Sequence, residues 1–295
     1  MRRQIIVVFF SLLCLALPPT WGADRGALFK VTAYNHTMYL FGTMHVGTPE
    51  FYPLEPRIAD AVKGASTLAL EIDPGLDPAI AAHALKTYGM TIPGATRQAL
   101  APAMRARLDR ALAKAHIDPE AVVPLKPWLV ATVLAMAEYA RQGYRTDLSV
   151  DAHLAQLARA SKVPVVGLES AGSQMSLFNR LTMAEQVGFL EESIGLIESG
   201  KQGVEVSKIV NAWRTADQGA FDEIAARASR DTSVSGKFVK HILLEERNNA
   251  LAEKLAQLLE REASTVAAIG VLHLIGENSV PSLLGERGMS VERVY

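Results

Sequence analysis

Cysteine is almost absent from this chain of 295 residues, and the single one, Cys14, lies in an N-terminal apolar run. The run follows two arginines and ends in Gly22-Ala23, a small-residue region suited to cleavage, so we predict an export signal over residues 1–23. The alternative is a retained membrane anchor, but Ile5 to Leu17 is short of the roughly 20 residues that span a bilayer. Cleavage would leave no cysteine, which excludes a disulfide, a thiolate nucleophile and Cys-ligated zinc.

An excess of charge of either sign is also lacking. Thirty Lys and Arg residues balance thirty-one Asp and Glu residues, so the formal net charge is −1. Such a chain has no global field to attract nucleic acid or an anionic membrane, and we predict neither as a partner once the signal is removed. We expect one exported domain over residues 24–295, periplasmic or secreted, because the chain contains no fixed-period repeat, low-complexity stretch or long linker.

Apolar runs that predict strands gather towards the two ends of this domain, while helical patterns fill its middle. The predicted strands are 28–34, 38–41, 67–72, 163–169, 265–270 and 290–294, the first two joined by a turn at Asn35-His36. Helical patterns begin at Asp77-Pro78 and cover 99–115, 128–141, 151–160, 183–198, 204–215, 218–228, 237–261 and 277–285. We therefore predict an α/β (α+β-like) fold, in which N- and C-terminal strands form a central mixed sheet with a large helical insertion.

Two Gly-x-x-His segments, Gly42 to His45 and Gly270 to His273, each follow a predicted strand. Glu71 and Glu169 also end strands, and ligands of open α/β sheets collect beyond the carboxyl ends of strands. Two imidazoles with one or two carboxylates would bind a divalent metal ion such as manganese, cobalt, zinc or iron. The glycines, Gly42 and Gly270, would let the backbone approach the ligand closely.

Each candidate also has an ordinary structural explanation. Gly-x-x-His is a pattern of only two letters, and Glu71 could be a strand-end charge facing water. Glu169-Ser-Ala-Gly is equally compatible with a solvated loop. Arg247 lies in a predicted helix, where its default role is a surface charge paired with Glu245 or Glu246. We predict structural roles for the other histidines of the helical region, namely His83, His116, His153 and His241.

The order of these segments resembles the TraB/GumN family over nearly the whole mature chain. The resemblance is carried by F-G-T-M-H-V-G with Y-P-L, L-A-L-E-I-D, K-P-W-L, D-A-H-L-A-Q-L-A-R with V-P-V-V-G-L-E and Gln174, E-E-R-N, and I-G-V-L-H-L-I-G-E with R-G-M-S-V-E-R-V. The family is related to the Tiki proteins, which are regarded as metal-dependent proteases, and its fold is similar to that of the erythromycin esterase superfamily. The resemblance implies that His45, His273 and Glu71 are site residues, together with the Glu246-Arg247 pair.

From the residues and the resemblance together, we expect an exported metal-dependent hydrolase acting on a peptide or similar substrate. His45 and His273 would be metal ligands, and Glu71 a ligand or the general base. Arg247, with Glu246 beside it, would orient a carboxylate or stabilise an oxyanion, and Glu169 would orient the ligands. The alternative is a non-catalytic periplasmic protein that binds or sequesters a peptide, a metal or another small ligand in the same pocket.

Overall fold

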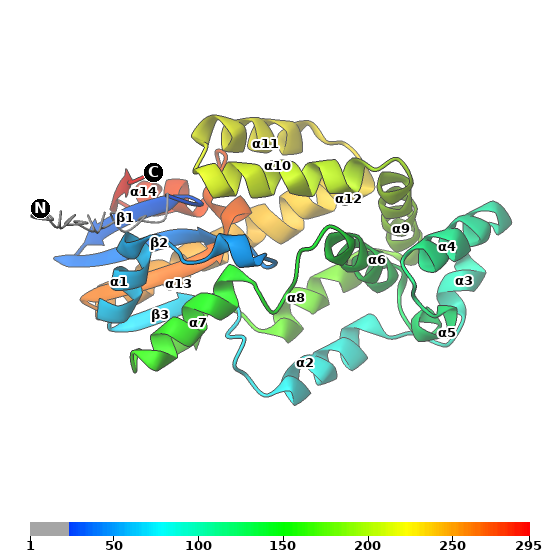
Figure 1. Ribbon diagram of the computed structural model, residues 1–295, viewed down its shortest axis with the longest axis horizontal. Coiled ribbons are helices and arrows are strands. Elements are labelled where there is room, and N and C mark those ends of the chain that lie inside the picture. The colour runs from blue at the N-terminus through cyan, green and yellow to red at the C-terminus, as the bar shows by residue number, and fades with distance from the viewer. Residues whose placement is uncertain (1–23) are drawn as a thin grey trace, which may run out of the picture.

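The computed structural model describes residues 24–295, so the predicted export signal over 1–23 lies outside the described residues. Six strands form one mixed sheet in the order β4-β3-β5-β2-β1-β6 (Figure 1). The strands are β1 Leu28–Ala33, β2 His36–Thr43, β3 Thr67–Leu70, β4 Val165–Gly167, β5 Ser264–Gly270 and β6 Ser290–Arg293. The predicted fold class is confirmed, since N- and C-terminal strands interleave around a helical insertion.

Strands β2, β5, β3 and β4 run parallel to one another, whereas β1 is antiparallel to both β2 and β6. In β5 every residue after Ser264 is buried, and β3 is buried throughout, as expected for parallel strands covered on both faces. The β1–β2 turn is Tyr34-Asn35, both with positive φ, rather than the predicted Asn35-His36. His36 instead begins β2, because a two-residue hairpin turn needs left-handed backbone at both of its central positions.

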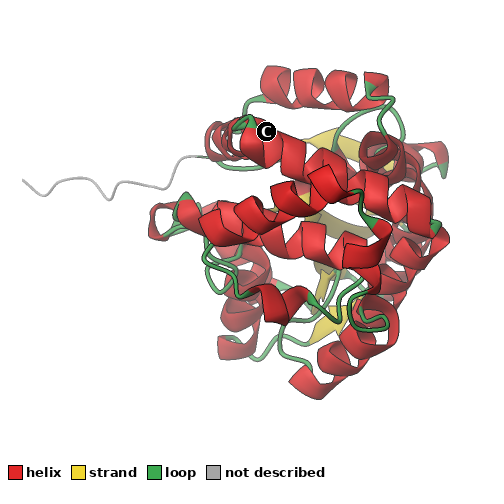
Figure 2. Cartoon of the chain, turned by 90° about the vertical axis from the view of Figure 1, so that its right-hand side faces the viewer, coloured by secondary structure: helices red, strands yellow, loops and turns green. Residues whose placement is uncertain are grey.

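Two pairs of helices cover the sheet. Helices α1 (Pro56–Gly64) and α7 (Val150–Ala160) contact each other and strands β3 to β5, while α13 (Arg247–Arg261) packs on β1, β2 and β5 and contacts α14 (Val280–Glu286). The remaining helices extend away from the sheet to one side, and Figure 2 shows them in front of the strands. They are α2 Pro78–Ala84, α3 Ala95–Ala99, α4 Pro102–Lys114, α5 Pro119–Val122, α6 Pro127–Arg141, α8 Ala171–Leu177, α9 Met183–Glu198, α10 Lys201–Thr215, α11 Gln218–Arg230 and α12 Val234–Phe238.

The helical segment predicted over 237–261 contains a change of helix type. A π-helix, Val239–Glu246, joins α12 to α13 and ends directly before Arg247. π-helical turns are rare and often accompany functional sites.

Helices α1 and α8 were not predicted. The sequence Glu169-Ser-Ala-Gly was compatible with a solvated loop, but its last two residues begin α8. Ser170 and Ser173 form its capping box, which begins a helix too short for a periodic signal. Within residues 24–295, none of the helices combines the length and apolarity needed to cross a bilayer.

Candidate functional site

Four parallel strands end at one edge of the sheet and bring the predicted site residues together. His45 lies two residues after β2, Glu71 directly after β3, Glu169 two residues after β4, and His273 three residues after β5. The carboxyl ends of neighbouring parallel strands lie side by side, so residues up to 228 positions apart in the sequence meet here.

Glu71 is the centre of the group and is only 4 % exposed. Its Oε1 accepts the Gly270 backbone N–H at 2.6 Å, and it lies 3.8 Å from Nε2 of His45 and 3.7 Å from Nε2 of His273. Burial by itself favours the uncharged acid, but His273, His45, Arg247 and the Gly270 amide favour the carboxylate and lower the pKa of Glu71 to about 2. Glu71 is therefore an anion at any physiological pH.

The other Glu71 oxygen belongs to an ion-paired network. Arg247 donates from Nη2 to Oε2 of Glu71 at 2.5 Å and to Oε2 of Glu169 at 2.6 Å. The Arg247 side chain is only 12 % exposed, and its Nη1 donates to the carbonyl of Leu243 in the π-helix. Gln174 on α8 donates to the same two carboxylates, at 3.2 and 2.8 Å. The arginine thus holds two carboxylates of the protein in place, and its expected role in stabilising an oxyanion stays a prediction.

The His45 ring is held by a carboxylate outside the glutamate network. Its Nδ1 lies 3.0 Å from Oδ2 of Asp151, in the first turn of α7, and the Thr43 hydroxyl donates to the other Asp151 oxygen at 2.8 Å. The packed surroundings of the ring disfavour the imidazolium, but Asp151 and Glu71 outweigh this effect and raise the pKa of His45 to about 9. The side chain is nevertheless 63 % exposed, so water reaches the site on the side of His45.

His273 differs from His45 in both burial and partner. It is 3 % exposed, and its Nδ1 lies 2.5 Å from the amide oxygen of Asn248 on α13. Burial outweighs the attraction of Glu71 and lowers the pKa of His273 to about 4, so the ring is neutral near pH 7. One histidine is therefore buried, neutral and held by an amide, and the other is exposed, basic and held by a carboxylate.

The two site glycines serve different purposes. A Cβ added at Gly270 would lie 3.1 Å from both Glu71 Oε1 and His45 Nε2, so the missing side chain leaves open the space between these two atoms. A Cβ at Gly42 would instead clash with Val271 at 2.8 Å, so Gly42 permits packing beneath the site rather than contact with a ligand.

Glu246 is a predicted site residue that the structure does not bring into the group. Its carboxylate is half-exposed and pairs with Arg180. Three further residues contact the site, and the sequence analysis assigned no role to any of them. They are Asp151, Asn248 and Gln174, which donates to both Glu71 and Glu169. The signals were present, because Asp151 begins D-A-H-L and Asn248 ends E-E-R-N, but neither segment shows from the sequence which residue it faces.

His153 and His241, for which structural roles were predicted, contact residues outside the site. His153 stacks on Tyr52 with ring centroids 4.2 Å apart, and His241 pairs with Glu245 at 2.7 Å.

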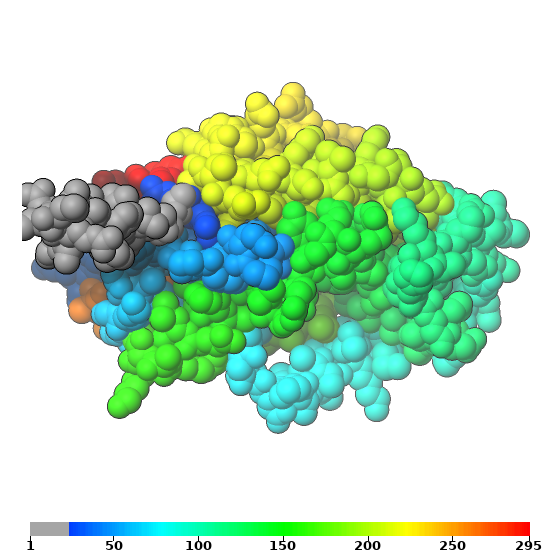
Figure 3. Space-filling view, in the orientation of Figure 1, coloured from blue at the N-terminus to red at the C-terminus, as the bar shows by residue number. Residues whose placement is uncertain are grey.

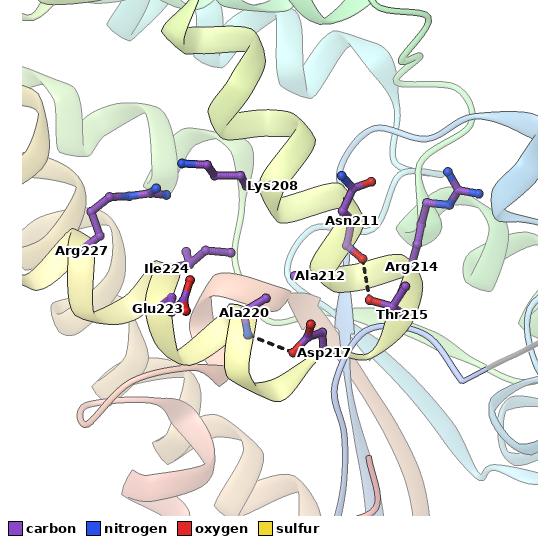
Figure 4. Close-up of a pocket in the computed structure, with 10 residues that line it drawn as sticks. All are labelled: Lys208, Asn211, Ala212, Arg214, Thr215, Asp217, Ala220, Glu223, Ile224 and Arg227. Atoms are coloured by element: carbon purple, nitrogen blue, oxygen red, sulfur yellow. Dashed lines mark hydrogen bonds between the residues drawn. The ribbon is translucent and has the colours of Figure 1, made fainter.

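A separate pocket of about 560 Å³ lies between α10 and α11, lined by both cationic and anionic side chains including Lys208, Arg227 and Glu223 (Figure 4). No residue of the Glu71 group lines it. The space-filling view instead shows a hollow between α2 and the green segments above it, towards α8, the helix that carries Gln174 (Figure 3).

The donor atoms can be compared with the needs of a metal ion. Among residues 24–295, no group of three or more His, Cys, Asp or Glu side chains is spaced to hold an ion as it stands. Two ligands of one tetrahedral ion, with bonds of about 2.0–2.2 Å, lie about 3.4 Å apart. The 3.7 and 3.8 Å separations from Glu71 Oε1 exceed this by a few tenths of an ångström. The exposed His45 ring has room to close its gap, whereas the gap to His273 lies between two buried side chains and would need a small shift of both.

The balance of charge around the site also suits a cation. Three carboxylates, those of Glu71, Glu169 and Asp151, face a single guanidinium, and protonation of His45 would still leave the group negative. Two imidazoles and a carboxylate form a donor set that divalent transition metals and zinc accept. The residues present therefore fit a divalent ion.

Comparison with known proteins places the chain in a family. It is 22 % identical over 273 residues to the uncharacterized protein YbaP of Escherichia coli K12, covering 90 % of this chain and 96 % of YbaP, and equally similar to YbaP of Shigella flexneri. An uncharacterized protein of Treponema pallidum is 22 % identical over 282 residues, covering 92 % of this chain and 84 % of its own. No solved structure matches the chain. The model of the TraB/PrgY/gumN family matches residues 27–293, and the chain belongs to that family.

Proposed function

We propose that the protein is an exported metal-dependent hydrolase that cleaves peptides or similar acyl compounds. The observation that carries the proposal is the convergence of two histidine Nε2 atoms on one oxygen of Glu71, next to Gly270, which has no side chain to fill the space. His45, His273 and Glu71 would hold the ion. When bound, it would supply the Lewis acidity that activates water and polarises a carbonyl.

The surrounding residues would fix the orientation of the metal ligands. Glu71 remains anionic, and a group with a pKa of about 2 is a poor general base near neutral pH, so the ligand role fits it better than the base role. Arg247 and Gln174 fix the second oxygen of Glu71 and bind Glu169 beside it. Asp151 orients His45, in the manner of the carboxylate partners of metal-binding histidines.

The substrate would approach on the exposed side of His45, since the other ligands are buried. The chain carries no charge excess that would favour a nucleic acid, and a peptide or small acyl compound suits an open edge of this kind. The alternative function, capture of a ligand without turnover, uses the same side chains and differs only in whether the bound molecule is returned intact.

Elemental analysis of the purified mature protein, together with digestion of a peptide library, would test the proposal. We expect about one divalent ion per chain and peptide cleavage that a chelator abolishes and added metal restores. Cleavage that withstands the chelator would contradict the metal-dependent mechanism. Tight capture of a library member that is recovered uncleaved would favour the binding protein. The Glu71→Gln variant provides the background rate in each assay.

A further inference from the structure

Asn248 faces two hydrogen-bonding partners, and one of them determines how its amide is oriented. The side-chain nitrogen lies 2.7 Å from the backbone carbonyl of Asn278, and the side-chain oxygen lies 2.5 Å from Nδ1 of His273. A backbone carbonyl can only accept, so the amide NH2 group must face Asn278. The amide oxygen is then left for His273.

This orientation fixes the position of the hydrogen on His273. The Asn248 oxygen can only accept, so Nδ1 of His273 must carry the hydrogen and donate it. In a neutral ring the lone pair is then on Nε2, the nitrogen that lies 3.7 Å from Glu71 Oε1. Asn248 is 3 % exposed, so water does not readily replace it as the acceptor.

A competing arrangement exists for the same ring. If Nε2 carried the hydrogen, a small shift from the present 3.7 Å separation would let His273 donate to the carboxylate of Glu71, and a charged acceptor binds such a donor more strongly than an amide does. That hydrogen bond would use the ring nitrogen and the oxygen on which the proposed site depends. The short contact with Asn248 is the observed feature that favours the Nδ1–H form instead.

We propose that Asn248 is a positioning residue that holds His273 in the Nδ1–H tautomer and so keeps Nε2 available as a ligand. The inference concerning the metal rests on the proposed function, whereas the tautomer is a property of the protein without metal. Asp151 provides the matching acceptor for Nδ1 of His45, and it is supported in turn by Thr43. Both rings thereby turn Nε2 towards Glu71.

The tautomer can be measured directly by ¹⁵N NMR of the histidine rings in chelator-treated mature protein, with the His273 signals assigned by their loss in His273→Ala. We expect the Nδ1–H form in the wild type and in Asn248→Asp, which retains an acceptor for Nδ1. In Asn248→Leu the ring should change to the Nε2–H form. Zn²⁺ affinity, measured by calorimetry, should fall roughly 10- to 100-fold in Asn248→Leu, as is usual when a partner of a ligand is lost.

The neighbouring residue offers a matched control. Asn249 lies on the same helix, is exposed and donates only to the Glu245 carbonyl, so Asn249→Leu should alter neither the tautomer nor Zn²⁺ affinity. An Nε2–H ring in the wild type or in Asn248→Asp, or an Nδ1–H ring in Asn248→Leu, would overturn the proposal. If Asn248→Leu fails to fold, the spectra of the wild type and of Asn248→Asp still test the tautomer. A wild type with the Nδ1–H ring but no Zn²⁺ binding would support the positioning role while refuting the proposed function.

Discussion

Arg247 donates from Nη2 to Oε2 of Glu71 at 2.5 Å, across 176 residues of sequence, and both side chains are nearly removed from water. This contact connects the helix α13 to the end of β3. It leaves Glu71 with one oxygen for Arg247 and Gln174 and the other for Gly270 and the histidines. The division explains how one carboxylate can both maintain the fold and contribute to a site.

Replacing Arg247 should therefore destabilise the protein more than replacing a surface arginine. Arg247→Leu would leave Glu71 and Glu169 buried without their cation, and loss of one partner of a buried pair costs about 3–5 kcal/mol. Arg180→Leu breaks only the half-exposed pair with Glu246, which solvent screens, and should cost much less. Denaturant unfolding of both variants in the presence of chelator measures the difference, and equal losses would show that the buried network adds little.

Glu71 and Glu246, which the sequence analysis both placed in the catalytic group, should differ in their effect on activity. Glu71→Gln should reduce turnover roughly 10²-fold or more and weaken metal binding, because the amide retains the shape but not the negative charge. Glu246→Gln should leave both near the wild-type level, since its carboxylate binds Arg180 outside the group. Rates are compared after circular dichroism has shown that both variants are folded. Wild-type turnover by Glu71→Gln would remove this residue from the mechanism.

The two histidines should behave as a unit. Either His45→Ala or His273→Ala should sharply weaken metal binding, and the double variant should lose much less than the sum of the two losses, because ligands of one ion are not independent. The ion should also raise the melting temperature of the wild type but not of the double variant. His241→Ala, which removes only a surface pair with Glu245, serves as the control. Additive losses in affinity would mean that the histidines do not share an ion.

A pH effect on stability should arise far from the site, at Glu55. This buried residue accepts a hydrogen bond from Tyr295, while its Oε2 has no partner among the described residues. Burial raises the pKa of Glu55 above its usual value. The folded state thus holds the proton more tightly than the unfolded state, so stability is highest below the unfolded pKa of about 4.3 and falls as the pH rises through the folded pKa.

Glu55→Gln should remove this pH dependence, because the amide does not titrate. The free energy of unfolding of the wild type, relative to that of Glu55→Gln, should decline as the pH rises above about 4. Urea unfolding over this range provides the comparison, with Glu292→Gln on the exposed part of β6 as the control. Parallel pH profiles for the wild type and Glu55→Gln would show that Glu55 has the same pKa in both states.

The N-terminal segment gives a prediction that is independent of the site. We expect protein recovered from the periplasm or the culture medium to begin near Ala23 or Asp24, because a basic start, a short apolar run and small residues together direct cleavage. N-terminal sequencing reads the cleavage position. Protein that still begins at Met1 and remains in the inner membrane would contradict the prediction.

Local patterns in the sequence were sufficient to determine the strands that carry the site. Continuous apolar runs such as Thr67–Leu70 predict buried strands without tertiary information, and Glu71 follows its run directly. The Gly-x-x-His segments could be assigned to strand ends for the same reason. The short helix α8 was missed because seven residues show too little periodicity, and its capping serines resemble an ordinary turn.

Only the tertiary structure decided which residues face one another. Adjacent residues of one motif, Glu246 and Arg247, diverge to the surface and to the site, because successive residues of a helix project in different directions and the π-helix ends between them. Asp151 and Asn248 became recognisable as partners of the histidines only when α7 and α13 were packed against the strand ends. Sequence patterns specify local conformation, whereas hydrogen bonds between side chains on different elements depend on how strands and helices are ordered and packed, and no local pattern encodes that order.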